Sequence, residues 1–394
     1  MTREISPPPL KRRRLAPKDA ESKAQSFRVF SWNINGVGAF LPPTTAKITT
    51  FFKQTNNSEA RPVSPPKTTG QRTSNLLRAF LARHNWPEVL FLQELKIKHG
   101  DSKTLAALLT AINTPLNSSD IASEGRSYTL DAVLPRDKYN ARGFQGRLYG
   151  VGTIIRKDFA RNHVTQIRDV DWDLEGRVNI VELKKGPAEN RPLALINIYA
   201  VNGTTAPYRS PETGKVAGTR HDHKLAFHTR LRDECLELEA RGYDVVVAGD
   251  LNIARGILDG HPNLRTHPAQ HCINRADFNA KFFGKEDNER ANAYVTVNDE
   301  DEACLDAVDV FRAIHGTERR HTYHPRTANW GSSCDRVDLI LVSKCLWEDG
   351  RVLNTGLLDS PQERGPSDHV PLWVELKGPG QEIIPARRTE PPDP

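Results

Sequence analysis

Polar side chains of the kinds that bind cations and phosphates follow short apolar runs in this chain. The run Val245 to Gly249 is followed at once by Asp250 and Asn252. Its β-branched residues predict a buried strand. Side chains two residues apart on a strand share a face, so both groups would turn towards one ligand if strand geometry persists. The alternative interpretation is that Asp and Asn here only begin a turn.

The same pattern recurs at five further runs, and turn formation alone does not explain so many. Three runs end in such residues: the run from Phe27 in Asn33 and Asn35, the run Val89 to Gln93 in Glu94 and Lys96, and the run from Leu193 in Tyr199 and Asn202. Two runs are preceded by them: Asp338 comes before Leu339 to Val342, and Ser367, Asp368 and His369 come before Val370 to Leu376.

The residue types at these positions indicate a hard divalent cation. Glu94 and Asp368 are carboxylates whose only basic neighbours in the sequence are Lys96 and His369. Oxygen ligands suit Mg²⁺, and the absence of clustered Cys and His argues against zinc. Mg²⁺ is therefore the expected cofactor, with Mn²⁺ as the alternative.

His369 has a neighbouring acid in Asp368 and a second available acid in Asp338. An acid and a histidine together tune a proton carrier or a transition-state contact. A single buried histidine is more often a satisfied core residue. Combined with the other polar positions, the pair favours metal-assisted cleavage of a phosphodiester.

Helices and strands alternate in the parts of the chain that must position these residues. Strands are predicted over 27–33, 89–93, 150–155, 178–183, 193–200 and 245–249, and two packed sheets with helices give the α+β class. The spacing of apolar residues predicts three helices. The first is capped by Thr73 or Ser74 and turns Leu76, Leu77, Phe80 and Leu81 inward. The second begins at Ser102 and turns Leu105, Leu108 and Leu109 inward. The third covers 223–240 and turns Phe227, Leu231, Cys235 and Leu238 inward.

The 394 residues carry a formal charge of +6, and residues 1–25 account for +4 of it. Net charge therefore indicates no general affinity for nucleic acid. Lys11 to Arg14, flanked by prolines, predict a nuclear localisation signal bound by an import receptor, the alternative being a solvated tail. Residues 1–25, an insertion at about 42–74 and residues 378–394 are expected to be disordered around one catalytic domain over 26–377.

Five scattered cysteines favour a reducing compartment, and Cys334 is interpreted as a packed thiol. No apolar run approaches the roughly 18 residues of a membrane span. We expect a soluble nuclear protein that acts as a monomer.

Taken in order, these motifs resemble the endonuclease/exonuclease/phosphatase superfamily, and within it the exonuclease III type of abasic-site (AP) endonuclease. The resemblance covers about Phe27 to Leu376, most of the chain. It rests on Ser31-Trp-Asn-Ile-Asn-Gly36, Leu92-Gln-Glu-Leu-Lys96, Glu175-Gly-Arg-Val178, Asn197-Ile-Tyr-Ala-Val-Asn202, Gly249-Asp-Leu-Asn252, Asp335-Arg-Val-Asp-Leu-Ile-Leu341 and Ser367-Asp-His369. It implies a four-layer α/β sandwich of the DNase I-like kind.

The resemblance also implies a role for each site residue. Glu94 corresponds to the main metal ligand, with Asp368 and Asn35 close to the metal and Asp250 and Asn252 also near it. The remaining roles are water activation by Asp250, water and phosphate orientation by Asn33 and Asn252, phosphate contacts by Tyr199 and Asn202, a phosphate-contacting dyad of Asp338 and His369, and a DNA-backbone contact by Arg177.

Some segments depart from the family pattern. Relatives carry Asp where this chain has Asn35, which favours one dominant metal. Of the aromatic residues expected around the abasic sugar, Tyr323 is present, but the segment Ser333 to Asp338 lacks the tryptophan, and Trp330 lies too far upstream. A Gly-Tyr-Ser-Gly segment is replaced by residues 146–150, Gly-Arg-Leu-Tyr-Gly.

The expected function is a DNA repair endonuclease of base excision repair that cuts 5′ to abasic sites, together with 3′–5′ exonuclease or 3′-phosphodiesterase activity on blocked ends. One alternative is another phosphodiesterase of the superfamily, acting on DNA ends or as an RNA deadenylase. The other alternative is a non-catalytic DNA-binding scaffold.

Overall fold

The computed structural model describes residues 26–41, 77–98, 100–117, 120, 124–140, 147–186, 190–295 and 303–378. The basic tail, the 42–74 insertion and the end of the chain from 379 lie outside these residues, and so do Leu76 and the predicted caps Thr73 and Ser74. In the described part of the chain, no helix has the length and apolar character needed to span a bilayer.

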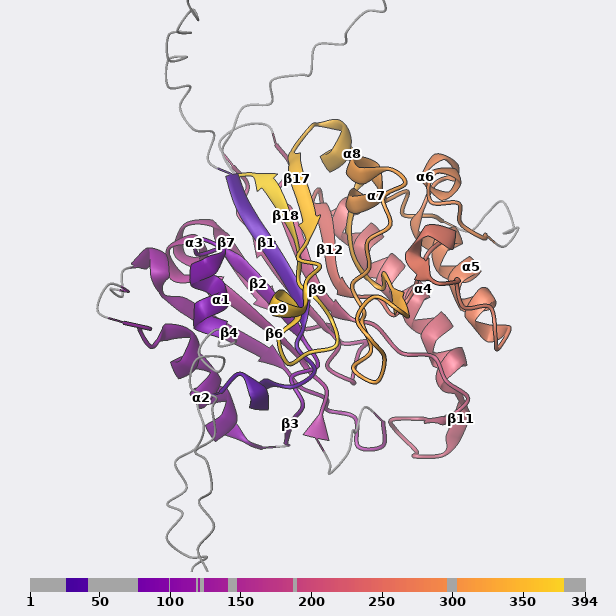
Figure 1. The fold of residues 1–394 in the computed structure, drawn as a ribbon, viewed down its shortest axis with the longest axis horizontal. Coiled ribbons are helices and arrows are strands. Elements are labelled where there is room, and N and C mark those ends of the chain that lie inside the picture. The colour runs from indigo at the N-terminus through magenta and orange to yellow at the C-terminus, as the bar shows by residue number, and fades with distance from the viewer. Residues whose placement is uncertain are drawn as a thin grey trace, which may run out of the picture.

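Two six-stranded mixed sheets form the centre of the molecule (Figure 1). The first has the order β17-β18-β1-β2-β6-β4, and the second β14-β16-β12-β9-β8-β7. The strands of the first are β17 (Val352–Leu357), β18 (Leu372–Lys377), β1 (Ser26–Asn33), β2 (Val89–Gln93), β6 (Val151–Arg156) and β4 (Tyr128–Val133). Those of the second are β14 (Val308–Asp309), β16 (Asp338–Val342), β12 (Asp244–Asp250), β9 (Leu193–Tyr199), β8 (Val178–Leu183) and β7 (Val164–Arg168).

Short pairs of strands flank these sheets: β3 (Ile97–Lys98) with β5 (Arg147–Leu148), β10 (Pro207–Arg209) with β11 (Val216–Thr219), and β13 (Gly260–His261) with β15 (Cys334–Asp335). The helices are α1 (Leu77–Arg83), α2 (Ser102–Asn113), α3 (Lys157–His163), α4 (Arg220–Ala240), α5 (Gln270–Phe282), α6 (Lys285–Arg290), α7 (Val310–His315), α8 (Lys344–Glu348) and α9 (Pro361–Arg364), with 3₁₀ turns η1 (Val37–Ala39), η2 (Glu124–Arg126) and η4 (Ile257–Asp259).

The alternation of side chains along each strand builds the layers. In β12, Val245 and Val247 pack with α4 and α5, whereas Val246 and Ala248 face the other sheet. On β1, in the other sheet, Phe30 packs against α1 on the outer side of that sheet. Because side chains two apart share a face, each central strand contributes to two cores. The result is a four-layer α/β sandwich, as the sequence predicts, with α1 and α2 outside one sheet and α4 and α5 outside the other (Figure 1).

The predicted helices form with one error. In α4 the expected residues Phe227, Leu231, Cys235 and Leu238 are all buried. In α2, Leu108 is buried, but Leu109 is 41% exposed and Ile112 takes the inward position. The inward face of α2 therefore follows the i, i+4 spacing of Leu108 and Ile112.

Buried polar side chains join the two sheets below the polar strand ends. Gln93 at the end of β2 donates to Asn197 of β9 over 2.8 Å, and Asn197 in turn donates to the carbonyl of Gly152 in β6 over 2.9 Å. Gln93 and Asn197 are fully buried. A buried amide that loses its hydrogen bonds is costly, so these bonds help to fix how the sheets meet.

The polar strand ends come together because the strands that carry them run in matched directions. β1 is parallel to β2, and β9 is parallel to β12, so each pair ends at one edge of its sheet. β16 runs antiparallel to β12, with Asp338 opposite Asp250. The start of β16 therefore lies where β12 ends.

Strand geometry does not persist beyond these ends. Asn252 has a φ of 53°, and Asn35, Glu94 and Lys96 have φ values of 52°, 54° and 51°. Left-handed backbone is uncommon for residues other than glycine and costs of order 1 kcal/mol or more. Asp250 and Asn252 therefore reach one pocket through a left-handed turn, which corrects the expectation that they share a strand face.

Candidate active site

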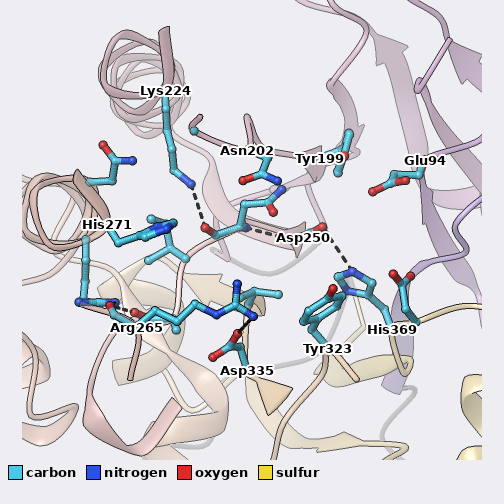
Figure 2. Close-up of a pocket in the computed structure, with 18 of the residues that line it drawn as sticks. Glu94, Tyr199, Asn202, Lys224, Asp250, Arg265, His271, Tyr323, Asp335 and His369 are labelled. Carbon is cyan, nitrogen blue, oxygen red and sulfur yellow. Dashed lines mark hydrogen bonds and ion pairs between the residues drawn. The ribbon is translucent and has the colours of Figure 1, made fainter. Parts of the chain in front are cut away.

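One cavity of about 320 Å³ lies at the edge where the strand ends meet (Figure 2). It collects most of the residues that the sequence assigned to the site. They are Asn35, Glu94, Tyr199, Asn202, Asp250, Asn252, Tyr323, Asp368 and His369. Side chains from both sheets thus face a single cavity.

Asp338 and His369 form the predicted pair. The Nδ1 atom of His369 donates to Oδ2 of Asp338 over 2.7 Å, and its Nε2 lies 3.9 Å from Oδ2 of Asp250. Burial alone would lower the pKa of His369, but the charges of Asp338 and Asp250 raise it to about 10. The imidazole is therefore protonated at neutral pH and can donate to a phosphate oxygen.

Asp250 is suited to accept a proton near neutral pH. Burial and the charge of Asp338 raise the pKa of Asp250, although the charge of His369 opposes them. The carboxyl accepts bonds from the backbone N–H of Asn252 over 2.9 Å and from Nδ2 of Asn33 over 3.0 Å. A buried carboxyl with a raised pKa is a candidate general base.

Asn33 is fully buried and links Asp250 to the acidic end of the cavity. Its Nδ2 also donates to Oε1 of Glu94 over 3.1 Å, and its Oδ1 accepts from the backbone N–H of Asn35 over 3.1 Å. The hydroxyl of Ser367 donates to the Asn33 carbonyl and accepts from the His369 N–H. One asparagine thus orients groups from β1, β2 and β12.

Glu94, Asn35 and Asp368 bring together oxygen atoms of the kind that would hold a cation. Nζ of Lys96 lies 2.6 Å from Oε2 of Glu94 and donates to Oδ1 of Asn35, whose Nδ2 donates to Asp368 over 2.8 Å. Burial would raise the pKa of Glu94, but Lys96 and Asn33 lower it below its usual value. An ionised carboxylate beside further oxygen donors fits a hard divalent cation.

The described residues also contain a tighter acid and histidine group, in which the ligand atoms of Asp250, Asp338 and His369 all lie within 4.8 Å of one another. The short hydrogen bond between His369 and Asp338 occupies the Nδ1 atom of that group. We therefore interpret these three as a proton-handling chain, and Glu94, Asp368 and Asn35 as the cation end. The resemblance also places Asp250 and Asn252 near the metal.

Tyr199 is 6% exposed, and both Tyr199 and Asn202 line the cavity. Nδ2 of Asn252 donates to the carbonyl of Ala200, the residue after Tyr199, over 2.9 Å. Burial and the charge of Glu94 raise the pKa of Tyr199, so its hydroxyl keeps its proton and can donate. Tyr199 and Asn202 thus line the cavity, and their phosphate contacts stay a prediction.

Arg177 is buried beside Glu175 and Tyr199. It is 3% exposed, its Nε contacts Glu175 over 2.7 Å, and its guanidinium lies 4.8 Å from the ring centre of Tyr199. These contacts hold the guanidinium against Tyr199, and the DNA-backbone contact that the resemblance implies stays a prediction.

Tyr323, the residue that the resemblance assigns to the abasic sugar, lines the cavity together with Val337 and Asp335. Tyr323 packs against His369 with ring centroids 5.0 Å apart. Asp335 pairs with Arg265 over 3.0 Å, which makes one wall charged where relatives are expected to be aromatic. Trp330 stacks on the ring of His324, whose centroid is 3.8 Å away, and does not line the cavity.

Sequence reasoning missed the residues at the other end of the cavity: Lys224, Arg265, His271, Asn274 and Arg275. Burial lowers the pKa of Lys224 to about 7. These residues come from α4, α5 and the loop before α5, and they follow no polar strand end. An amphipathic helix with a lysine among its inward positions was the one signal present in the sequence.

Comparisons with solved structures support the fold. The chain aligns with the catalytic domain of Xenopus laevis APE2 at a TM-score of 0.56 and 17% identity, covering 92% of this chain and 94% of that one. An AP endonuclease from Leishmania major gives 0.55 and 18%, covering 90% and 88%, and a 3′–5′ exonuclease from Neisseria meningitidis gives 0.50 and 18%, covering 89% and 100%. Comparison with curated protein sequences gives no match.

These identities are low, so the solved structures establish the arrangement of the sheets alone. The family comparison is stronger, because residues 30–369 match the model of the Endonuclease/Exonuclease/phosphatase family. That span contains every polar strand end described above. The chain belongs to the Endonuclease/Exonuclease/phosphatase family.

Proposed function

We propose that this protein is a Mg²⁺-dependent DNA phosphodiesterase that cuts 5′ to abasic sites in base excision repair and also removes 3′-blocking groups or nucleotides. The observation that carries this proposal is the continuous set of contacts in one cavity. It runs from Asp338 through His369 to Asp250, then through Asn33 to Glu94 and onward to Asp368. Such a set supplies a proton acceptor, a protonated donor and a cation end, which in-line phosphodiester cleavage requires.

Each group has a distinct task in this reaction. Asp250 accepts the proton of the attacking water, and Asn33 and Asn252 hold Asp250 and the water in line. His369, kept protonated by Asp338, donates to a non-bridging phosphate oxygen, and Tyr199 donates to the same phosphate.

Glu94, Asp368 and Asn35 would hold the divalent cation. A cation bound there adds positive charge next to the phosphate, where negative charge develops during cleavage. In the absence of a third carboxylate at position 35, we propose one dominant metal ion. Lys96 contacts the same oxygen donors, and it would move aside or share them.

The substrate is the finer part of the proposal. Tyr323 and Val337 give the cavity an apolar wall for an extrahelical sugar, and the Leishmania major structure named as an AP endonuclease shares the fold. The charged pair of Asp335 and Arg265 favours a second candidate, a phosphodiesterase that trims 3′ ends and has little preference for abasic sites. The structure of the 3′–5′ exonuclease from Neisseria meningitidis shares the fold as well.

The cellular setting is also a proposal. Lys11 to Arg14 would bind a nuclear import receptor, and the protein would act in the nucleus as a monomer on DNA. A fluorescent fusion of the full chain would be nuclear, and replacing these four residues by alanine would make it diffuse. An unchanged distribution would contradict the signal.

Product mapping tests the function. A duplex with one abasic-site analogue, an undamaged duplex, a duplex with a blocked 3′ end and a single-stranded RNA are each labelled and incubated with Mg²⁺ or with chelator. We expect a Mg²⁺-dependent cut immediately 5′ to the analogue. Cleavage confined to the 3′ ends would select the second candidate, whereas cleavage of RNA alone would contradict both.

A further inference from the structure

The cavity has two ends of opposite charge. Glu94 lies at one end and Lys224, His271 and Arg265 lie at the other, with Asp250 between them (Figure 2). The proposed chemistry uses the acidic end and the centre. It gives no role to the basic end, although those residues line the same cavity.

Lys224, in the early part of α4, is a buried amine whose charged form has little to neutralise it. It is 3% exposed, and its Nζ donates to the backbone carbonyl of Asn252 over 2.8 Å. Among the residues that the structure describes, no carboxylate lies within ion-pair distance of it. The carboxylate whose charge acts on it, Asp250, already accepts bonds from Asn33 and Asn252.

An ammonium group has three donors, and a buried one that lacks an anion is unfavourable. One backbone carbonyl satisfies a single donor. Lys224 lines the cavity, so an anion bound there can accept from its remaining donors. We expect an anionic group of the substrate to accept these hydrogen bonds and to supply the missing counter-charge.

Arg275 of α5 repeats this arrangement. It is 3% exposed, and its Nε and Nη2 donate to the carbonyls of Ala254 and Arg265 over 2.7 and 2.8 Å. Its Nη1 reaches only the sulfur of Cys272, at 3.9 Å. Across the described ranges it too has no carboxylate at ion-pair distance. Backbone carbonyls thus aim the guanidinium without cancelling its charge.

Close packing fixes these groups beside the predicted phosphate contacts. Gly203 follows Asn202, and a Cβ added at Gly203 would lie 2.7 Å from Nδ1 of His221 and 3.1 Å from Cδ of Lys224. The glycine lets the loop that carries Asn202 close onto the lysine. The basic end therefore adjoins the place where the scissile phosphate is expected.

We propose that Lys224 and Arg275 form a second phosphate subsite, which binds the phosphate group next to the scissile one on the same strand. This inference rests on the proposed phosphodiesterase function. Two buried cations beside a first phosphate contact suit a chain that carries its phosphates in series. The second phosphate is either an internal diester or a terminal monoester, and the chemistry of recognition is the same.

The test measures binding, so that it does not depend on turnover. Equilibrium binding of labelled duplexes with an abasic-site analogue is followed by fluorescence anisotropy in chelator. The duplexes carry an uncharged methylphosphonate at the 5′ or the 3′ neighbour of the scissile phosphate. Two further duplexes have one strand interrupted beside that phosphate, and the strand end at the interruption carries a terminal phosphate in one duplex and none in the other.

Wild type, Lys224→Met and the control Lys103→Met are compared. Lys103 is exposed on α2, far along the chain from the cavity, so its loss removes one charge without touching the subsite. We expect one neutralised or missing phosphate to weaken binding by wild type and by Lys103→Met about tenfold or more. Lys224→Met binds the unmodified duplex about tenfold more weakly and shows no further loss with that modification.

A modification that weakens binding by wild type but not by Lys224→Met is coupled to Lys224, and its position distinguishes the internal diester from the terminal monoester. If Lys224→Met lowers the melting temperature, Arg275→Gln takes its place in the same comparison. The inference is overturned if the penalty of neutralisation is the same in wild type and in the variants, or if Lys103→Met matches Lys224→Met. Wild type that cuts the duplex but shows no coupling refutes the subsite alone, whereas wild type that neither binds nor cuts any duplex refutes the proposed function as well.

Discussion

Asp309 is the residue whose loss should destabilise the protein most clearly. It is fully buried on β14 and accepts from Nη1 and Nη2 of Arg336 over 3.0 and 2.7 Å and from Nη1 of Arg255 over 3.1 Å. It also caps α7 by accepting from the N–H of Arg312 over 3.3 Å. Arg336 lies two residues before Asp338, so this buried network anchors the start of β16.

The cost of Asp309→Ala follows from these contacts. Removing one partner of a buried ion pair costs about 3–5 kcal/mol, because it leaves the guanidinium groups of Arg336 and Arg255 short of a counter-charge. Loss of the helix cap adds about 1 kcal/mol. We expect a decrease of at least about 4 kcal/mol in the free energy of unfolding, a large share of the roughly 5–15 kcal/mol typical of a folded domain.

Urea denaturation followed by tryptophan fluorescence measures this decrease, since the chain has six tryptophans. Lys344→Ala is the matched control. Its pair with Asp306 has a similar distance of 2.7 Å, but the two side chains are 49% and 46% exposed. An exposed pair contributes about 0–1 kcal/mol. If Asp309→Ala costs no more than the control, the argument from burial is wrong.

The same network predicts a dependence on pH. Burial would raise the pKa of Asp309, but Arg336 and Arg255 outweigh it and hold the pKa well below its usual value. A depressed folded-state pKa contributes stability that is present above the unfolded value of about 3.9 and is lost as pH falls below it. The free energy of unfolding of wild type should therefore fall more steeply than that of Asp309→Ala between about pH 5 and pH 3. Parallel curves would contradict the assignment.

Three further variants have sharp expectations. Asn197→Val removes one of the two acceptors of the Gln93 amide, the other being Ser31, and it also removes the donor to the Gly152 carbonyl. It should cost about 1–3 kcal/mol in urea denaturation, and a neutral result would show that the remaining bonds suffice to hold the sheets. Gly249→Ala places a Cβ 2.0 Å from the carbonyl oxygen of Ile198, so little soluble, cooperatively folding protein should be recovered, and a normal melting curve would refute the contact. Asp338→Asn removes the charge that keeps the neighbouring imidazole protonated and should lower kcat about 100-fold or more at unchanged melting temperature; unchanged kcat would exclude that imidazole as a donor.

The sequence was informative where one local pattern decides the structure. The polar strand ends could be predicted because strands that end in parallel bring their next residues to one edge, and α4 could be predicted from its apolar spacing. The left-handed backbone at Asn35, Glu94 and Asn252 could not, because tertiary contacts impose it. For Asp250 and Asn252 the prediction of a shared cavity was right, although its reason was wrong.

Contacts between distant segments account for the other features that the sequence did not show. Arg177 lies in a family motif, but only the fold shows that Glu175 and Tyr199 surround it. Lys224 lies among charged residues on a long helix, and only its spacing from Phe227 and Leu231 places it on the inward face. Its partner in the proposed subsite, Arg275, is brought to it by the packing of α4 against α5.

The most direct test of the proposed chemistry compares wild type with Asp250→Asn on a duplex that contains one abasic-site analogue, with Mg²⁺ and with chelator. The substitution keeps the size of the side chain and removes the proton acceptor. We predict Mg²⁺-dependent cleavage 5′ to the analogue by wild type and a loss of at least about 100-fold in the variant, with binding of the duplex retained. Cleavage by the variant at the wild-type rate, or by wild type in chelator, would contradict the assignment of this cavity as a metal-assisted phosphodiesterase site.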